Sequence, residues 1–377
     1  MTRRPHHDIL QQGVSAWNLW RAAHPEIRPS LANTDLQGLD LTEANLHAVN
    51  LRGADLRDAS LSGALLAEAE LRKSMLCGAD LSHADLTQAD LSQADLSDAY
   101  LSGAQLADAD LKAANLNRAD LSNADLSRAG LSRVQLDQTS FAQAQLGEAD
   151  LSGATGDRPS FVNADLSGAD LNRAELTAAD FSGATLRGAD LSGANCGRSQ
   201  FADADLQGVQ GDRADFSFAN LADLDLSHAQ LTGANLQHAN LVGTNLAQAD
   251  LTAANLSQAD LTGAGLQAAE LSAANLSGAY LSAADLRAAN LQRATLVQTL
   301  IMLSSNLQGA NLQGSNCQET QFIAADLSDA DFRDANLTKA RWENVQLHNT
   351  QFGNNLGLNK RQRRKLHQRG GLFPEPL

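Results

Sequence analysis

A single five-residue pattern, A-(D/N)-L-x-x, recurs through most of the chain and restricts the folds that it can adopt. Leu81, Leu86 and Leu91 show the spacing, each with Ala two places before it. The central position keeps this register without a break from Leu36 to Ile301, over 54 repeats. Hydrophobic content is 43% but aromatic content only 4%, so the core of such a chain must be built from Leu and Ala.

Neither a regular helix nor a flat strand buries residues that are spaced by five. On an α-helix, successive leucines stand about 140° apart and spread around the whole surface. On a flat strand, an odd spacing sends every second leucine to the opposite face. The period suits a chain that turns after each repeat, with Leu and the preceding Ala pointing inward. The sequence therefore predicts an all-β solenoid.

Repeats such as Ala79-Asp80-Leu81-Ser82 resemble those of the pentapeptide-repeat family. The resemblance extends over about 320 residues and implies a right-handed quadrilateral β-helix with four repeats per coil. At four repeats per coil, 64 repeats make about 16 coils, or about 75 Å at the spacing of hydrogen-bonded strands. We expect an N-terminal capping helix in 1–30, the β-helix in 31–353, and a C-terminal cap with a short basic helix in 354–377.

The N-terminal segment is predicted to be one helix over residues 8–24, with Asp8 as its N-cap. Trp17 and Trp20 recur at helical spacing, and Pro25 prevents continuation. We favour a cap over the first open coil, because solenoid ends need covering. A helix that binds a partner is the alternative.

Four phenylalanines stand twenty residues apart: Phe141, Phe161, Phe181 and Phe201. A coil of four repeats stacks them on one side, which favours a core ladder over a ligand-binding aromatic box. The register then slips by one residue within 301–306. If the slip is a one-residue bulge, Phe322 and Trp342 return to that side of the coil, and Phe332 and Phe352 share another.

Two repeats carry Gly at the centre, in the segments Gly156-Asp157-Arg158 and Gly211-Asp212-Arg213. The favoured interpretation is steric: either the missing Leu leaves room for a neighbouring Phe, or the backbone bulges where only Gly fits. The alternative is that the exposed Asp and Arg side chains form contact sites.

The three cysteines are far apart and odd in number, which suggests thiols in a reducing compartment. Cys196 and Cys317 occupy central positions and should be buried, whereas Cys77 occupies an outward position. No secretory signal and no run of about eighteen apolar residues is present, so we expect a cytoplasmic protein that does not enter a membrane.

The net charge of −16 is unevenly distributed. Residues 1–30 carry +2, residues 356–377 carry +5 and the repeat region between them carries −23. In the tail, Asn359 is predicted to cap a basic helix that Gly370 ends. We expect a solvated end; binding of a polyanion, including a second copy of the acidic repeat region, is the alternative.

The carboxylates follow the repeat instead of converging on one point, and no nucleophile, phosphate-loop or zinc motif is present. A closed coil filled with side chains also leaves no concave pocket. We therefore expect no enzymatic activity, no cofactor and no metal site. The most acidic side of the coil is the candidate binding row, formed by Glu70, Asp90, Asp110, Asp150, Asp170, Asp190, Asp250 and Glu270.

The leading functional hypothesis is a rigid, acidic scaffold that binds an unidentified protein. Some members of the resembling family imitate duplex DNA and bind type II topoisomerases, so a DNA mimic acting on gyrase or topoisomerase IV is the alternative. Over 75 Å, B-DNA carries about 44 charges, roughly twice the charge of the repeat region. A third hypothesis is self-association through the ends, and we expect no direct binding of nucleic acid by the coil.

Overall fold

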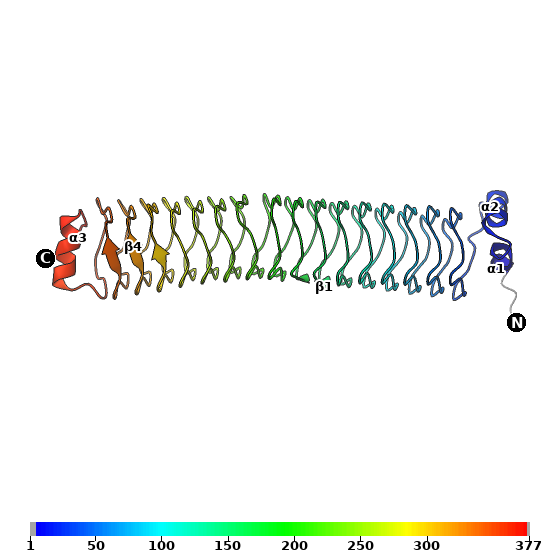
Figure 1. Cartoon of the computed structure of the whole chain (residues 1–377), viewed down its shortest axis with the longest axis horizontal. Coiled ribbons are helices and arrows are strands. Elements are labelled where there is room, and N and C mark those ends of the chain that lie inside the picture. Colours follow the sequence, from blue (N-terminus) through cyan, green and yellow to red (C-terminus); the bar gives the residue numbers. More distant parts are fainter. Residues whose placement is uncertain (1–4, 375–377) are drawn as a thin grey trace. The chain divides into compact units, whose positions relative to one another are not determined.

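The computed structural model describes residues 5–374, in two compact units, Met1–Asp190 and Leu191–Leu377. The chain winds in coils and contains a few short helices and strands (Figure 1). The first unit contains α1 (Pro5–Leu10), α2 (Val14–Ala23), β1 (Thr155–Asp157) and β2 (Glu175–Thr177). The second contains β3 (Leu300–Ile301), β4 (Gln321–Ile323), β5 (Arg341–Glu343) and α3 (Lys360–Gln368).

Parallel pairing between residues twenty apart defines the coil. In the first unit Asp80 bridges Tyr100, and the Leu81 N–H donates to the Tyr100 carbonyl at 2.7 Å. In the second unit Asn235 bridges Asn255 in the same way. Twenty residues are four repeats, so each coil has four sides. This register confirms the β-helix that the five-residue period predicts.

Regular strands are short because each side of the coil contributes one bridge before the chain turns. Within residues 5–374 the strands form two small parallel sheets, β1-β2 and β3-β4-β5, and isolated bridges form the other rungs. The turn falls two residues after the central Leu, where residues such as Gln88 (φ 57) and Arg118 (φ 60) are left-handed. The geometry therefore overrides the preference of non-glycine residues for negative φ.

The core of each unit consists of stacked Leu, Ala and Phe side chains. In the first unit Phe161 lies between Phe141 and Phe181, with ring centroids 5.1 and 4.9 Å away and planes within 4° of parallel. All three rings are completely buried. In the second unit Phe201 is also buried and meets Phe216 edge to face, with centroids 6.0 Å apart.

The register of the repeats in the second unit slips between Ile301 and Asn306. Tyr280 bridges Leu300, twenty residues on, but Asp285 bridges Asn306, one residue further. The extra residue lies in a turn where Leu303 and Ser304 have φ of 53° and 67°. Beyond it, two aromatic stacks continue the core: Phe322 on Trp342 with centroids 4.6 Å apart, and Phe332 on Phe352 at 5.7 Å.

The two glycine-centred repeats have different causes. A Cβ atom on Gly156 would lie 2.9 Å from the carbonyl carbon of Leu136, so backbone approaches backbone here. A Cβ atom on Gly211 would lie 2.9 Å from Leu231 and 3.3 Å from the Phe216 ring, so side chains occupy the space. Neither site accommodates a leucine.

The prediction of one N-terminal helix over residues 8–24 is wrong. The chain forms α1 and α2, separated at Gly13, whose φ of 99° interrupts the helical path. Asp8 lies inside α1 and is not an N-cap. Trp17 on α2 is fully buried, and its Nε1 donates to the Asn45 carbonyl at 2.8 Å. α2 therefore packs on the first coils of its unit.

The C-terminal helix α3 begins with a capping box in which Asn359 and Gln362 exchange side-chain and backbone hydrogen bonds. Leu366 is buried, and Phe373 stacks on Phe352 with centroids 5.0 Å apart. The side chain of Leu372, however, is 49% exposed. Only its backbone extends the coil, because the Phe352 N–H donates to the Leu372 carbonyl at 2.9 Å.

The burial of the thiols leads to a first prediction. Cys317 is buried, and burial raises the pKa of its thiol to about 12, although a hydrogen bond from Ser315 opposes this. Because only thiolates react with iodoacetamide, native protein at about pH 8 should be modified at the half-buried Cys77 and not at Cys196 or Cys317. Mass spectrometry of digested protein checks this. A Cys77→Ser variant that is still labelled in the native state would contradict it.

Candidate functional site

In many repeats the acidic residue is held by the backbone that follows it. Oδ1 of Asp150 accepts a hydrogen bond from the Ser152 N–H at 2.9 Å, and Asp170 is held by the Asn172 N–H at 2.8 Å. Oδ2 of Asp150 has no such partner among residues 5–374. Asp150 is thus oriented through one oxygen, and its second oxygen is left for a ligand.

The carboxylates align because the repeat returns to the same side every twenty residues. In the first unit, consecutive bridges join Glu70, Asp90, Asp110, Gly130, Asp150, Asp170 and Asp190. We call the six acidic members of this series the acidic row; Gly130 interrupts it. Its rungs are about 4.8 Å apart, the distance between hydrogen-bonded strands. In the second unit Asp250 and Glu270 bridge one another.

The acidic row differs electrostatically from carboxylates at the turns. Asp98 and Asp108 lie at turns, and hydrogen bonds from Arg118 and Arg128 respectively lower the pKa of each carboxyl. In the described part of the chain, none of the five row carboxylates from Glu70 to Asp170 takes part in an ion pair. The row therefore keeps more uncompensated charge than the turns do.

The second-unit pair is more tightly held. Burial raises the pKa of Asp250, but hydrogen bonds from Thr252 and Thr232 outweigh it, and the net shift is downward. Oε1 of Glu270 accepts from the Asn290 amide at 2.7 Å. The pair thus has fewer acceptor positions left for a partner.

The side chains of the glycine-centred repeats make local contacts, in separate units. Arg158 pairs with Asp157 next to it, with Nε 3.0 Å from Oδ2. Asp212 accepts from the Thr232 N–H at 2.9 Å, and Arg213 is exposed. These segments do not contribute to the acidic row.

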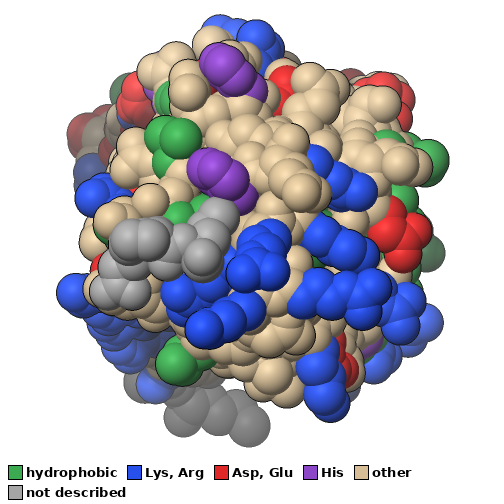
Figure 2. Space-filling view, turned by 90° about the vertical axis from the view of Figure 1, so that its left-hand side faces the viewer, with side chains coloured by type: hydrophobic (Ala, Val, Ile, Leu, Met, Phe, Trp, Pro, Cys, Tyr) green, Lys and Arg blue, Asp and Glu red, His purple; other side chains and the backbone are tan. Residues whose placement is uncertain are grey.

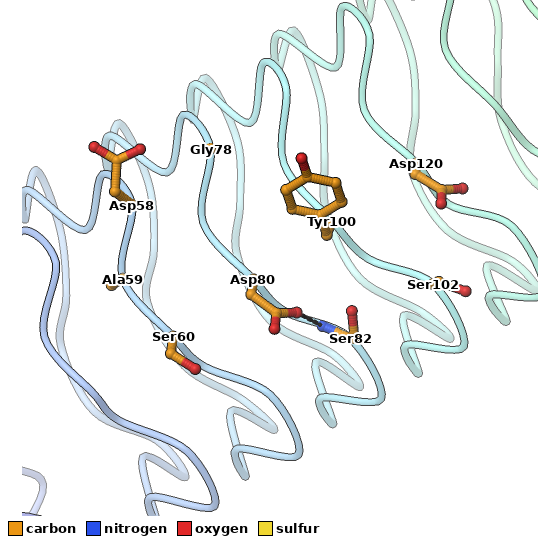
Figure 3. A pocket seen from close by; sticks show the side chains of 9 residues that line it. All are labelled: Asp58, Ala59, Ser60, Gly78, Asp80, Ser82, Tyr100, Ser102 and Asp120. Carbon is orange, nitrogen blue, oxygen red and sulfur yellow. Dashed lines mark hydrogen bonds between the residues drawn. The ribbon is translucent and has the colours of Figure 1, made fainter.

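Another side of the first unit carries a hollow that the sequence reasoning missed. Figure 3 shows Tyr100 on the coil between those of Asp80 and Asp120, and the small residues Ser60 and Gly78 also line the hollow. The hollow has a volume of about 420 Å³. Tyr100 is 57% exposed, and none of the described residues that line the hollow is basic.

A sequence signal for this hollow exists in retrospect. Tyr100 occupies the repeat position that usually holds Asp or Asn, with Asp twenty residues before and after it. An aromatic face between carboxylates suits a cationic side chain, through cation–π contact and charge–charge attraction. Tyr280 has the same repeat position but Leu300 as its following neighbour, and is a natural point of comparison.

Other classes of site are not found in the described part of the chain. Among residues 5–374, no group of three or more His, Cys, Asp or Glu side chains is placed to hold a metal ion. Within the same range, no helix combines the length and apolar character needed to cross a bilayer.

Comparison with known families gives one match. The profile described as pentapeptide repeats matches most of the chain, over residues 30–63, 54–93, 94–133, 160–195, 194–233, 229–267, 266–300, 305–341 and 325–354. The unmatched stretch between the third and fourth ranges contains Gly156-Asp157-Arg158. Comparison with curated protein sequences gave no significant match.

Two solved structures are similar in sequence. HetL, a pentapeptide repeat protein involved in heterocyst differentiation regulation from the cyanobacterium Nostoc, is 34% identical over 65% of this chain and 94% of HetL, with a TM-score of 0.24. Full-length QnrB1, a plasmid-mediated fluoroquinolone resistance protein, is 17% identical over 62% of this chain and 96% of QnrB1, with a TM-score of 0.24. TM-scores this low carry no structural argument.

Proposed function

Because this chain belongs to the pentapeptide-repeat family, we propose that it is a non-enzymatic, cytoplasmic scaffold whose acidic row binds a basic protein. A right-handed winding, about 16 coils, and capping by α2 and α3 are part of the proposal. The observation that carries it is the alignment of carboxylates on consecutive bridges of the first unit, of which those from Glu70 to Asp170 take part in no ion pair within residues 5–374. That unit contains 27 Asp and Glu against 15 Lys and Arg.

The arrangement favours a basic partner on physical grounds. Carboxylates held on a regular line are already oriented, so binding costs little conformational entropy on the scaffold side. Their summed field attracts positively charged proteins and speeds encounter. The hollow at Tyr100 adds an aromatic contact for an Arg or Lys side chain.

Affinity capture from the native host tests this proposal. The bait variant removes five row charges by Glu70→Gln, Asp90→Asn, Asp110→Asn, Asp150→Asn and Asp170→Asn. The matched control removes five charges from other sides by Asp85→Asn, Asp95→Asn, Asp125→Asn, Asp165→Asn and Asp180→Asn. Asn preserves the fold because Asn255 already accepts from the Ser257 N–H at 3.2 Å in the equivalent position.

We expect wild type and control to retain a partner that the row variant loses by at least about tenfold, and that salt releases. A partner retained equally by both variants contradicts the role of the row. Failure of any variant to keep the far-ultraviolet circular dichroism of wild type would exclude it from the comparison.

A DNA mimic that binds gyrase or topoisomerase IV is the second candidate. The favouring observation is the regular line of carboxylates in the acidic row, and the weakening one is its lower charge density than DNA. This candidate predicts that the purified protein inhibits supercoiling, or relieves quinolone inhibition, at about micromolar concentration or below. Absence of both effects removes it.

A further inference from the structure

A cavity of about 220 Å³ lies between α3 and the last coils of the second unit. Ala340 and Trp342 line it from the coil, and Gln362, Lys365, Leu366 and Arg369 line it from the helix and its end. Figure 2 shows Lys and Arg side chains gathered on the face that carries α3. The acidic row belongs to the first unit, so this cavity is a separate feature.

Trp342 is fixed firmly on one side of the cavity. Its ring stacks on Phe322 and meets Phe332 and Phe352 edge to face, with centroids 5.7 and 5.9 Å away. Its Nε1 is buried and has no hydrogen-bond acceptor among the described residues. A buried donor without an acceptor is destabilising, so this N–H is free to donate to a ligand.

The other polar groups around the cavity are also donors. Oε1 of Gln362 is already used, because it accepts from the Asn359 N–H at 3.0 Å, which leaves its amide nitrogen. Nη1 of Arg369 donates to the Trp342 carbonyl at 3.1 Å, which holds the guanidinium against the backbone of Trp342. Among the residues that the structure describes, no carboxylate lines the cavity. The lining therefore offers two cations and two neutral donors, and no unused side-chain acceptor.

The surrounding charge strengthens this asymmetry. Within residues 5–374, none of the six cations from Lys360 to Arg369 takes part in an ion pair. The positive potential of the four cations outside the lining adds to that of the cavity-lining Lys365 and Arg369. An anion is the only common ligand that satisfies donors and positive charge together.

We propose that this cavity binds an oxyanion, either a phosphoryl group or a carboxylate, held by Lys365, Arg369, the Gln362 amide and the Trp342 Nε1–H. A cavity of about 220 Å³ accommodates such a group. Entry of the anion requires a small adjustment of the ring, because Nε1 is buried under the present surface. Binding gives Nε1 a hydrogen-bond acceptor, so the signal of the indole N–H should change when the anion binds.

The indole N–H signals of the ¹⁵N-labelled full chain provide the test. Inorganic phosphate and acetate are titrated separately against chloride at constant ionic strength, and the Trp342 signal is assigned with Trp342→Phe. We expect a saturable shift of the Trp342 signal at about millimolar phosphate or acetate, with the Trp17 signal unchanged. Tighter phosphate binding identifies a phosphoryl ligand, and tighter acetate binding a carboxylate.

A matched pair of double variants separates the cavity from general charge. Lys365→Gln with Arg369→Gln should weaken binding at least about tenfold, because two charge-assisted hydrogen bonds are lost. Arg361→Gln with Arg364→Gln removes the same charge from exposed positions outside the cavity and should change affinity by less than about threefold. Trp342→Phe, followed by calorimetry, should weaken binding about fivefold.

Three results overturn the inference. One is no saturable shift of the Trp342 signal with either anion up to about 50 mM, a concentration that would reveal any Kd near the millimolar range. Another is an equal loss of affinity in both double variants, which would show general charge attraction. The third is full affinity in Trp342→Phe, which would remove the indole from the site.

Discussion

Replacing Phe161 by Ala is expected to lower the free energy of unfolding of the first unit by about 3–5 kcal/mol. The ring is completely buried and is stacked on both faces, by Phe141 and Phe181. Its removal leaves a cavity between rigid coils that cannot collapse, because main-chain hydrogen bonds fix the distance from each coil to the next. The loss therefore includes the aromatic contacts as well as the transfer of the ring.

Urea unfolding with hydrogen-exchange mass spectrometry measures this effect. Because each coil contacts only its neighbours, the exchange should rise most in the coils around Phe161. The control is Phe218→Ala, the same change at a ring that is 53% exposed, for which we expect a loss below about 1 kcal/mol. Equal effects of the two substitutions would contradict the core ladder.

Replacing Trp17 by Ala is expected to have an effect of similar size, about 3–5 kcal/mol for the first unit. Trp17 is the only tryptophan with no exposed surface among the described residues, and its Nε1 satisfies the Asn45 carbonyl. Its removal loosens α2, although Asn18 and Arg21 also hydrogen bond to the coil. Once α2 is loosened, the first coils of the unit become exposed to solvent.

Two further variants on α2 separate the loss of Trp17 packing from the loss of its hydrogen bond and from the truncation of an exposed side chain. Trp17→Phe keeps most of the packing but lacks the indole donor, so its loss should be about 1–2 kcal/mol smaller than that of Trp17→Ala. Leu19→Ala removes a side chain that is 74% exposed and should cost less than about 0.5 kcal/mol. Urea midpoints and light scattering are the measurements. A wild-type midpoint for Trp17→Ala would show that α2 does not cover the coil.

The repeat region is predictable because the same local structure recurs in every coil. One five-residue period decides which residue points inward, and twenty-residue spacing decides which residues lie side by side. The stack of Phe141 on Phe161 and the succession from Asp90 to Asp110 follow directly from these two numbers. Neither depends on contacts between dissimilar segments.

Departures from the repeat are less predictable. Gly13 breaks the N-terminal helix although Trp17 and Trp20 continue a helical spacing. The hydrophobic side chain of Leu372 is half exposed to solvent, while its backbone extends the ladder. In both cases the packing of a unique segment against a coil, not the local pattern, decides the outcome.

The sequence by itself determined that the chain is an all-β solenoid with a Leu and Ala core, since residues spaced by five are buried only if the chain turns after each repeat. The four sides of the coil, and with them the rows of carboxylates, were what the family resemblance implied. Only the tertiary structure decided which side carries a hollow at Tyr100, and that the indole of Trp342 lies buried without an acceptor beside the cations of α3. These features depend on the volumes and directions of side chains brought together from different coils or from a helix and a coil. The five-residue period does not specify contacts of this kind.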